Sequence, residues 1–303
     1  MTLQELRYIV ALADAGSFQR AAEQCHISQP TLSQQVKKLE EYLGAVLFDR
    51  SLRRIAPTPV GEQIVASSRL ILEEANRIRA IAREGLDPMS RTLHLGIIPT
   101  LGPYLLPRIL GAIHRAHPAL RLLLREEFTD ALLDKLESGV LDAALIALPP
   151  ERERLRAEPL FDELFYAALP RNHALARGKH VELREFSEQS VLLLEEGHCM
   201  RDQALEICGR KANYNDEIKA TSLETLRQMV GLGVGCTLLP ALAVDAVSVK
   251  ARGNAVAIRP FRKPAPRRRV GLVWRQRSSA ERTLLTLAAT MRANLPPGVD
   301  PAR

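Results

Sequence analysis

The chain has 303 residues, 46% of them hydrophobic and 25% charged, a composition that excludes a single small domain and indicates a globular protein with a sizeable core. Its net charge of +7 fits a nucleic-acid partner. Residues 252–303 carry a net charge of +10 and residues 1–60 only +1, so the charge alone does not locate a DNA-binding surface.

The N-terminal segment has acidic and polar residues within its apolar pattern, unlike a secretory signal, and no apolar run approaches the length of a membrane span. We therefore expect a cytoplasmic protein. In a reducing compartment, Cys25, Cys199, Cys208 and Cys236 do not suggest a structural disulfide framework. No CxxC pair or zinc-type histidine spacing is present, so no metal or other cofactor is expected.

The first sixty residues predict a small helical module. Apolar residues at helical spacing indicate short helices near residues 3–13 and 18–22, and a third helix that has Pro30 in its first turn and Gly44 as its C-cap. The outer face of the third helix is rich in Thr, Ser, Gln and Lys, which suit base edges and phosphates. Residues 46–55 predict a β-wing whose arginines contact the DNA backbone or minor groove. The alternative is a helical bundle with a solvated polar face.

Residues 59–83 predict one long helix. Its apolar residues repeat in a heptad-like pattern through Ile64, Ile71 and Ile78, and charged residues flank them. This favours a dimerising coiled coil over packing on the helix's own domain. A symmetric dimer would present two recognition helices to a two-fold related DNA site.

From residue 88 onward, strand-like and helical segments alternate, which predicts an α/β architecture. Helices are expected at 103–116 and 130–138. The predicted strands are Thr92–Ile98, Leu120–Arg125, Ala143–Leu148, Leu164–Leu169, Val191–Leu194, Cys236–Leu239, Ala255–Ile258 and Val270–Trp274. The tail at 296–301 is expected to be disordered. The basic run 267–269 is interpreted as a solvated rim, with a surface for an acidic partner as the alternative.

The segment 195–208 contains the clearest chemical signal. Gly197 ends a strand and residues 200–207 favour a helix, so Cys199 lies at or near a helix N-terminus. Free amides and the positive helix end, with Arg201 nearby, favour a thiolate there. A thiolate reacts with peroxide to give a sulfenic acid, with which Cys208 can condense.

Geometry makes this pair more than a simple bridge. Nine residues of helix span about 13–14 Å, whereas disulfides need Cα atoms roughly 4.4–6.8 Å apart. If 199–208 is helical when reduced, oxidation must therefore unwind it, which would give a regulator a bistable element. The alternative is that both cysteines are inert buried side chains.

The segment SFQRAAEQCHISQPTLSQQVKKLEEYLGAVLFDR closely resembles the N-terminal winged helix-turn-helix of LysR-type transcription regulators. The resemblance implies a mainly α winged helix-turn-helix at 1–58, with a recognition helix near 29–40, and a linker and dimerisation helix at 59–87. It also implies an α/β regulatory domain at 88–303 and assembly into homodimers and homotetramers. The DNA-contacting positions that we expect are Gln29, Pro30, Thr31, Ser33, Gln34, Lys37, Lys38, Arg50, Arg53 and Arg54.

The regulatory domain of this family has two subdomains that resemble periplasmic binding proteins, the second inserted into the first. The resemblance places subdomain I at 88–163 plus 268–303 and subdomain II at 164–267. A ligand or sensing site would lie between them.

GHCMRDQALEIC closely resembles the redox segment of the hydrogen-peroxide-sensing members of this family, and so do GIIPTLGPYLLP, FTDALLDKLESG, ATSLETLRQMV and TLLPALAV. The resemblance implies that Cys199 reacts with hydrogen peroxide and that Cys208 resolves the product as a disulfide. The peroxide-binding residues that it implies are Thr100, Thr129, His198 and Cys199, and Arg201 and Asp202 would tune the loop.

By the same resemblance the protein is not an enzyme but a regulator of oxidative-stress genes. Double-stranded DNA and RNA polymerase would be its partners, and glutathione with glutaredoxin would reduce it. Cys236 departs from an aliphatic position of the family, so we expect a small buried side chain there, and Cys25 is expected to be a core residue.

Three other functions are compatible with parts of this sequence. The first is a LysR-type regulator that binds a small organic ligand between its subdomains, with incidental cysteines. The second is a thiol peroxidase, against which the DNA-binding module argues. The third is a periplasmic solute-binding protein, which the missing export signal excludes.

Overall fold

The structure is a computed structural model that describes residues 1–49, 55–82, 88–150, 152–209, 212–248 and 255–302. Its contacts divide the chain into two compact units, 1–86 and 87–303. The fold is an N-terminal helix-turn-helix domain followed by an α/β regulatory domain, as predicted. Among the described residues, no helix combines the length and the apolar character needed to cross a membrane.

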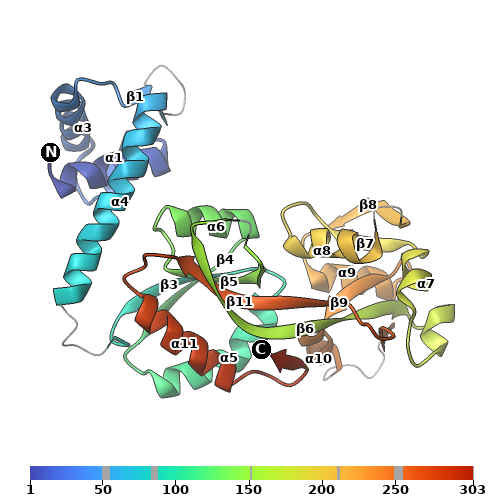
Figure 1. Cartoon of the computed structure of the whole chain (residues 1–303). Coiled ribbons are helices and arrows are strands. Elements are labelled where there is room, and N and C mark those ends of the chain that lie inside the picture. The colour runs from blue at the N-terminus through green and yellow to red at the C-terminus, as the bar shows by residue number, and fades with distance from the viewer. Residues whose placement is uncertain (50–54, 83–87, 151, 210–211, 249–254, 303) are drawn as a thin grey trace. The chain divides into compact units, whose positions relative to one another are not determined.

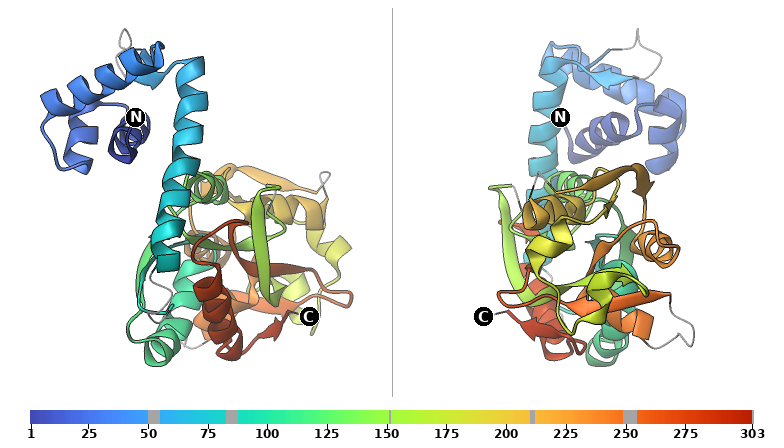
Figure 2. Two further views of the ribbon diagram at one scale, coloured as in Figure 1. Left: turned by 60° about the vertical axis from the view of Figure 1, so that its left-hand side comes forward. Right: turned by 90° about the vertical axis from the view of Figure 1, so that its right-hand side faces the viewer.

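The N-terminal unit consists of short helices and a two-stranded wing at one end of a long helix (Figures 1 and 2). A capping box between Thr2 and Glu5 starts the first helix, and Ser28 accepts a hydrogen bond from the Thr31 amide at the start of the third. Gly44 ends the third helix in the left-handed region, as predicted. The elements are α1 (Leu3–Ala15), α2 (Phe18–Gln24), α3 (Gln29–Leu43), β1 (Phe48–Asp49), β2 (Ala56–Pro57) and α4 (Pro59–Ala82).

The core of this unit holds α3 against the wing and α4. Leu32, Val36 and Leu39 are buried on the inner face of α3. The Glu40 carboxylate accepts hydrogen bonds from the Leu47 and Phe48 amides and so ties the start of the wing to α3. On α4, Leu70, Ile71 and Ile78 are exposed. Arg50, Arg53 and Arg54 lie outside the described residues.

The regulatory unit is built on a mixed sheet with strand order β10-β6-β11-β5-β3-β4. In Figure 1, helices α5 and α11 lie on one side of the first part of the sheet and α6 on the other. The elements of this part are β3 (Thr92–Ile97), α5 (Gly102–Ala116), β4 (Arg121–Glu126), α6 (Thr129–Glu137), β5 (Ala143–Leu148), β6 (Leu155–Pro170), β11 (Arg267–Arg275), α11 (Glu281–Ala293) and β12 (Val299–Pro301).

The second part of the regulatory unit carries the two cysteines of interest. Its small parallel sheet pairs β7 with β8, and α8 lies beside β7 (Figure 1). Its elements are η1 (Ala174–Arg177), α7 (Leu183–Ser187), β7 (Val191–Leu194), α8 (Cys199–Cys208), β8 (Tyr214–Ala220), α9 (Leu223–Gly231), β9 (Thr237–Pro240), α10 (Ala241–Ser248) and β10 (Val256–Pro260).

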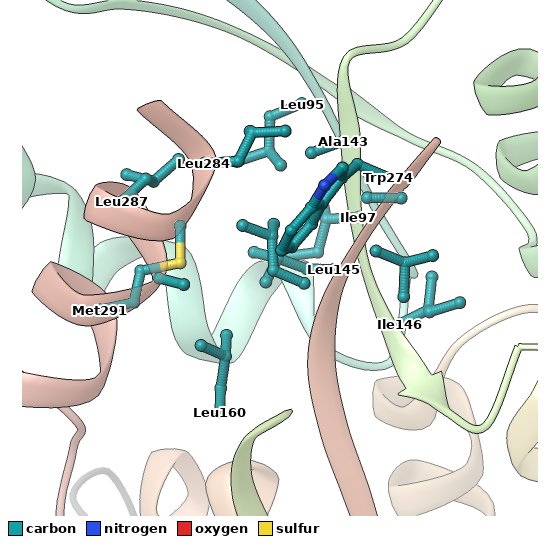
Figure 3. Close-up of a cluster of buried hydrophobic side chains, with 14 of the residues drawn as sticks. Leu95, Ile97, Ala143, Leu145, Ile146, Leu160, Trp274, Leu284, Leu287 and Met291 are labelled. Atoms are coloured by element: carbon teal, nitrogen blue, oxygen red, sulfur yellow. The ribbon is translucent and has the colours of Figure 1, made fainter. Parts of the chain in front are cut away.

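Two separate hydrophobic cores underlie the two parts. The first surrounds Trp274, which packs among aliphatic side chains of β3, β5 and α11 (Figure 3). The second contains Phe165, Phe186 and Phe261. Tyr104 packs against both. The division into subdomain I (88–163 plus 268–303) and subdomain II (164–267) stays a prediction, and it is supported by the presence of two separate cores.

Strand β6 connects the two parts. It pairs with β11 from Leu155 to Leu164 and with β9 and β10 from Phe165 to Pro170, so both cores share one continuous strand. Its N-terminal half was not predicted. The expected disorder of the tail is wrong, because β12 pairs with residues 161–163 of β6.

A glycine fixes the approach of α4 to the wing. A Cβ on Gly61 would lie 2.0 Å from the Leu47 carbonyl oxygen, which itself accepts a hydrogen bond from the Thr58 amide. We expect Gly61→Ala to destabilise the N-terminal unit by about 1–3 kcal/mol, because backbone must move. Urea unfolding followed by circular dichroism measures this.

The matched control is Gly111→Ala in α5, where the added Cβ would meet only the Arg115 guanidinium at 3.4 Å. Replacing a glycine inside a helix by alanine lowers the conformational entropy lost on folding, so this variant should stabilise the regulatory unit by about 0.5–1 kcal/mol. The fluorescence of Trp274, the only tryptophan of the sequence, follows the unfolding of this unit. Unchanged unfolding of the Gly61→Ala protein would contradict the described contact.

Candidate functional site

Helix α8 begins at Cys199 and ends at Cys208, so the predicted helix between the two cysteines is present. At 1.5 Å per residue, their Cα atoms lie about 13–14 Å apart, too far for a disulfide. Both are free thiols. Cys199 packs against the core around Trp274, whereas Cys208 packs against the core that contains Phe165. The helix thus holds the two sulfurs in different cores.

Two helix N-termini meet at Cys199. His198 and Cys199 are the N-cap and first residue of α8, and Phe128 and Thr129 hold the same positions in α6. The rings of Phe128 and His198 are 4.6 Å apart, edge to face, and the Thr129 hydroxyl interacts with the Cys199 sulfur. In the part of the chain that the structure describes, neither N-cap side chain caps its helix. The first-turn amides therefore give the site positive polarity.

Gly197 makes this approach possible. Its φ of +96° lies in a region that L residues avoid, and a Cβ there would be 3.0 Å from the Phe128 ring. The chain between β7 and α8 therefore turns directly against Phe128.

Three buried polar atoms beside Cys199 have no hydrogen-bond partner of ordinary geometry among the described residues: the two ring nitrogens of His198, a residue only 2% exposed, and the Thr129 hydroxyl, which contacts the Cys199 sulfur. Burial lowers the pKa of His198, against the opposing charge of Glu195 and an interaction with the Thr221 backbone, so the imidazole is neutral at pH 7. Buried polar groups are normally satisfied, and this cluster therefore fits a binding site for a small polar molecule.

Arg268 is the residue that sequence reasoning missed. Its side chain is 1% exposed and pairs with the fully buried Glu163 at 2.8 Å. It also donates to the Thr100 hydroxyl at 3.0 Å and to the Thr100 carbonyl at 3.2 Å. The predicted solvated rim is wrong at this position, whereas Arg267 and Arg269 are exposed.

The sequence signal for the burial of Arg268 is the alternation of side chains between the two faces of a strand, applied to β11. Arg268 shares a face with Val270, Leu272 and Trp274, at two-residue steps, and that face is buried.

Burial dominates the ionisation of Cys199 and raises the pKa of its thiol. The charge of Arg268, the Thr129 hydroxyl and the Met200 amide lower this pKa, and Asp202 raises it. The net direction is opposite to the thiolate expected from the sequence, because desolvation outweighs the helix end. The cation that lowers the pKa of Cys199 is therefore Arg268 and not Arg201, whose guanidinium donates a hydrogen bond to the Leu194 carbonyl at 3.1 Å.

Burial also governs the other cysteines. It raises the pKa of Cys208 to about 11 and that of Cys236, which is 1% exposed, to about 12. Cys25 is half-buried beside the N-terminal core, and burial raises its pKa as well. Within the described ranges, no group of three or more His, Cys, Asp or Glu residues forms a candidate metal site.

The polar face of α3 is open to solvent. Six of the seven predicted contact residues on it are exposed and Ser33 is half-buried; the exposed ones are Gln29, Pro30, Thr31, Gln34, Lys37 and Lys38. Lys37 also forms a surface ion pair with Glu41 at 3.7 Å.

Residues 3–62 match the family model of the bacterial regulatory helix-turn-helix protein, lysR family, and residues 87–296 match that of the LysR substrate binding domain. The chain is 42% identical over 296 residues to the DNA-binding transcriptional dual regulator OxyR of Escherichia coli K12, covering 97% of this chain and 96% of that protein.

Solved structures agree with this similarity. A full-length OxyR C199D from Pseudomonas aeruginosa is 43% identical, with a TM-score of 0.83 over 96% of this chain and 95% of that one. The reduced form of an OxyR is 42% identical, with a TM-score of 0.63 over 70% of this chain and 98% of that one.

The raised pKa of Cys208 predicts slow alkylation in the folded protein. In a Cys199→Ser variant at pH 7, we expect iodoacetamide to modify Cys208 roughly 100-fold more slowly than in the urea-unfolded chain, because a pKa near 11 leaves less thiolate. The rate should rise with pH towards 11. Mass spectrometry of the Cys208 peptide measures it, with the Cys236 peptide as a slower internal reference. Equal rates in the folded and unfolded chains would contradict the burial.

Proposed function

The chain belongs to the LysR family of bacterial transcription regulators, and we propose that it senses hydrogen peroxide through Cys199 and Cys208. The observation that carries the proposal is the set of unsatisfied buried polar atoms around a cysteine that a helix separates from its partner thiol. Thr100, Thr129, His198 and Cys199 would bind the peroxide.

The polar groups suit a molecule that both donates and accepts hydrogen bonds. The Thr100 hydroxyl accepts from Arg268, so its own proton remains free to donate. The Thr129 hydroxyl contacts the Cys199 sulfur and can still accept a hydrogen bond from a bound molecule. Neutral His198 offers one donor and one acceptor nitrogen. Because burial raises the pKa of the Cys199 thiol, its proton has to leave as the sulfur reacts, and the hydroxyl and imidazole groups beside it would relay that proton.

In the first step, the Cys199 sulfur attacks one peroxide oxygen. An S–O bond forms while the O–O bond breaks, and the sulfur loses two electrons to the departing oxygen. That oxygen takes up a proton, donated through the surrounding hydroxyl or imidazole groups, and leaves as water. Cys199 becomes a sulfenic acid.

In the second step, the Cys208 sulfur attacks the sulfenic sulfur. The S–S bond forms, the S–O bond breaks, and the hydroxyl leaves as water with the proton of Cys208. Because α8 holds the sulfurs apart, it must unwind before this bond forms. Unwinding also takes Cys208 out of its core, which removes the burial that keeps it protonated.

Helix α8 is suited to such a change. Of its ten residues, only Met200 and Ala204 are fully buried. Leu205, Ile207 and Cys208 pack against a core while partly exposed, so opening the helix gives up less packing than unwinding a fully buried helix would. An isolated helix of this length is marginal in water. Arg201 and Asp202, in its first turn, would tune how readily the segment rearranges.

The same proposal extends to the partners. Oxidation would remodel the regulatory domain of a homodimer or homotetramer in the cytoplasm, and so change how two recognition helices engage double-stranded DNA and RNA polymerase at oxidative-stress genes. Glutathione with glutaredoxin would restore the thiols. The protein would act as a sensor that is oxidised once per signal and not as an enzyme.

Peroxide treatment followed by disulfide mapping tests the sensor. We expect one equivalent of hydrogen peroxide to join Cys199 to Cys208, Cys199→Ser to abolish both this bond and the transcriptional response, and DNA binding to survive. Cys236→Ser is the matched control and should leave the pairing unchanged. Unmodified Cys199 in peroxide-treated protein would remove the proposal and favour an organic ligand as the effector.

A second test concerns the DNA surface. Gln34→Ala, on the exposed face of α3, should weaken binding to an operator selected with the unaltered protein by about 1–3 kcal/mol, because a base contact is lost. Gln4→Ala, on the exposed face of α1, is the control and should leave affinity within about twofold. Fluorescence anisotropy measures both. Equal affinity of the two variants would count against α3 as the recognition helix.

A further inference from the structure

The guanidinium beside the sensing site is held by a carboxylate that the proposed reaction does not use. Glu163 and Arg268 face each other in the register of β6 and β11. Their ion pair has a separation of 2.8 Å and exposures of 0% and 1%. A buried pair of this kind costs desolvation unless further hydrogen bonds satisfy it.

Those further bonds reach into both parts of the regulatory unit. The second Glu163 oxygen accepts from the Leu242 amide in the first turn of α10 at 2.7 Å. Leu242 packs in the core around Trp274, and its neighbour Ala243 in the other core. Glu163 therefore links Arg268 to the backbone of a helix that touches both cores.

The Glu163–Arg268 ion pair lies where the chain passes from the first part of the regulatory unit to the second. Immediately after Glu163 and Leu164, β6 leaves β11 and begins to pair with β9 and β10. The Phe165 amide donates to the Pro266 carbonyl at 2.9 Å, so the two crossing segments are joined there. The Arg268 guanidinium also lies 5.9 Å from the centre of the Phe165 ring. The guanidinium is thus fixed on several sides.

We propose that Glu163 is a positioning residue of the sensing site, which holds the Arg268 guanidinium where it supports Thr100 and the Cys199 thiolate. With Glu163 in place, Arg268 Nε is committed to the carboxylate and its two terminal nitrogens are aimed at Thr100. Without it, a buried cation would lack its counter-charge and reorient towards other acceptors. The charge of Arg268 lowers the pKa of Cys199 and that of Asp202 raises it, so loss of the Arg268 field shifts Cys199 further towards the protonated thiol.

The test is the rate at which iodoacetamide alkylates Cys199 in a Cys208→Ser protein, followed from pH 6 to 11 on the Cys199 peptide. Glu163→Gln keeps the shape of the side chain and removes its charge. We expect it to slow alkylation roughly tenfold at pH 7, where thiolate is scarce, and to leave the rate at the highest pH unchanged. A purely structural disturbance would instead alter access to Cys199 at every pH.

A double-mutant cycle identifies the route. Arg268→Met should slow alkylation at least as much, and adding Glu163→Gln to it should slow alkylation no further, because Glu163 acts through Arg268. Asp162→Asn is the matched control, since Asp162 is the neighbouring carboxylate of β6 and pairs with the exposed Arg269. It should leave the rate within about twofold.

Glu163→Asp guards against a variant that fails to fold. It keeps the charge and shortens the reach, so it should also slow alkylation at pH 7. A rate equal to or faster than that of the parent in a folded Glu163 variant, or additive effects in the cycle, would overturn the inference. The inference rests on the proposed function, but alkylation needs no peroxide, so a failure of the sensor and a failure of the positioning role are distinguishable.

Discussion

The helical state of ten residues is the constraint on which the rest depends. As long as α8 is wound, Cys199 belongs to one hydrophobic core and Cys208 to the other. A disulfide between them and an intact helix are therefore mutually exclusive. A chemical change at one sulfur is converted into a change of backbone, which is large enough for a regulator to transmit.

The surroundings of Cys199 balance two requirements. Burial keeps the thiol protonated, while Arg268, Thr129 and the helix ends favour the anion that must form during reaction. A small molecule that donates and accepts hydrogen bonds can satisfy the free polar atoms and exchange a proton with them. Selectivity for peroxide would then come from access and hydrogen bonding more than from a permanently ionised thiol. Strands β6 and β11 support the site, because Arg268 belongs to β11 and its guanidinium pairs with Glu163 of β6.

Local patterns in the sequence predicted much of this arrangement. Helical periodicity and turn residues gave α3, α4 and α8 close to their observed bounds, since each is governed by neighbours within a few positions. The long strand β6 was only half predicted, because its polar residues at the crossing are paired with distant ones. The pairing of β12 was missed for the same reason. Arg268 was missed because three consecutive arginines look solvated unless strand alternation is applied. That Phe128 would face His198 is a tertiary fact that no local pattern contains.

The central claim is tested most directly by hydrogen exchange of the α8 amides in the reduced and peroxide-oxidised protein. The account predicts that amides of residues 203–207, protected in the reduced helix, exchange rapidly after oxidation, while those of β11 stay protected in both states. Equal protection of residues 203–207 in a protein whose Cys199–Cys208 disulfide has formed would contradict it, because the bond would then coexist with the helix.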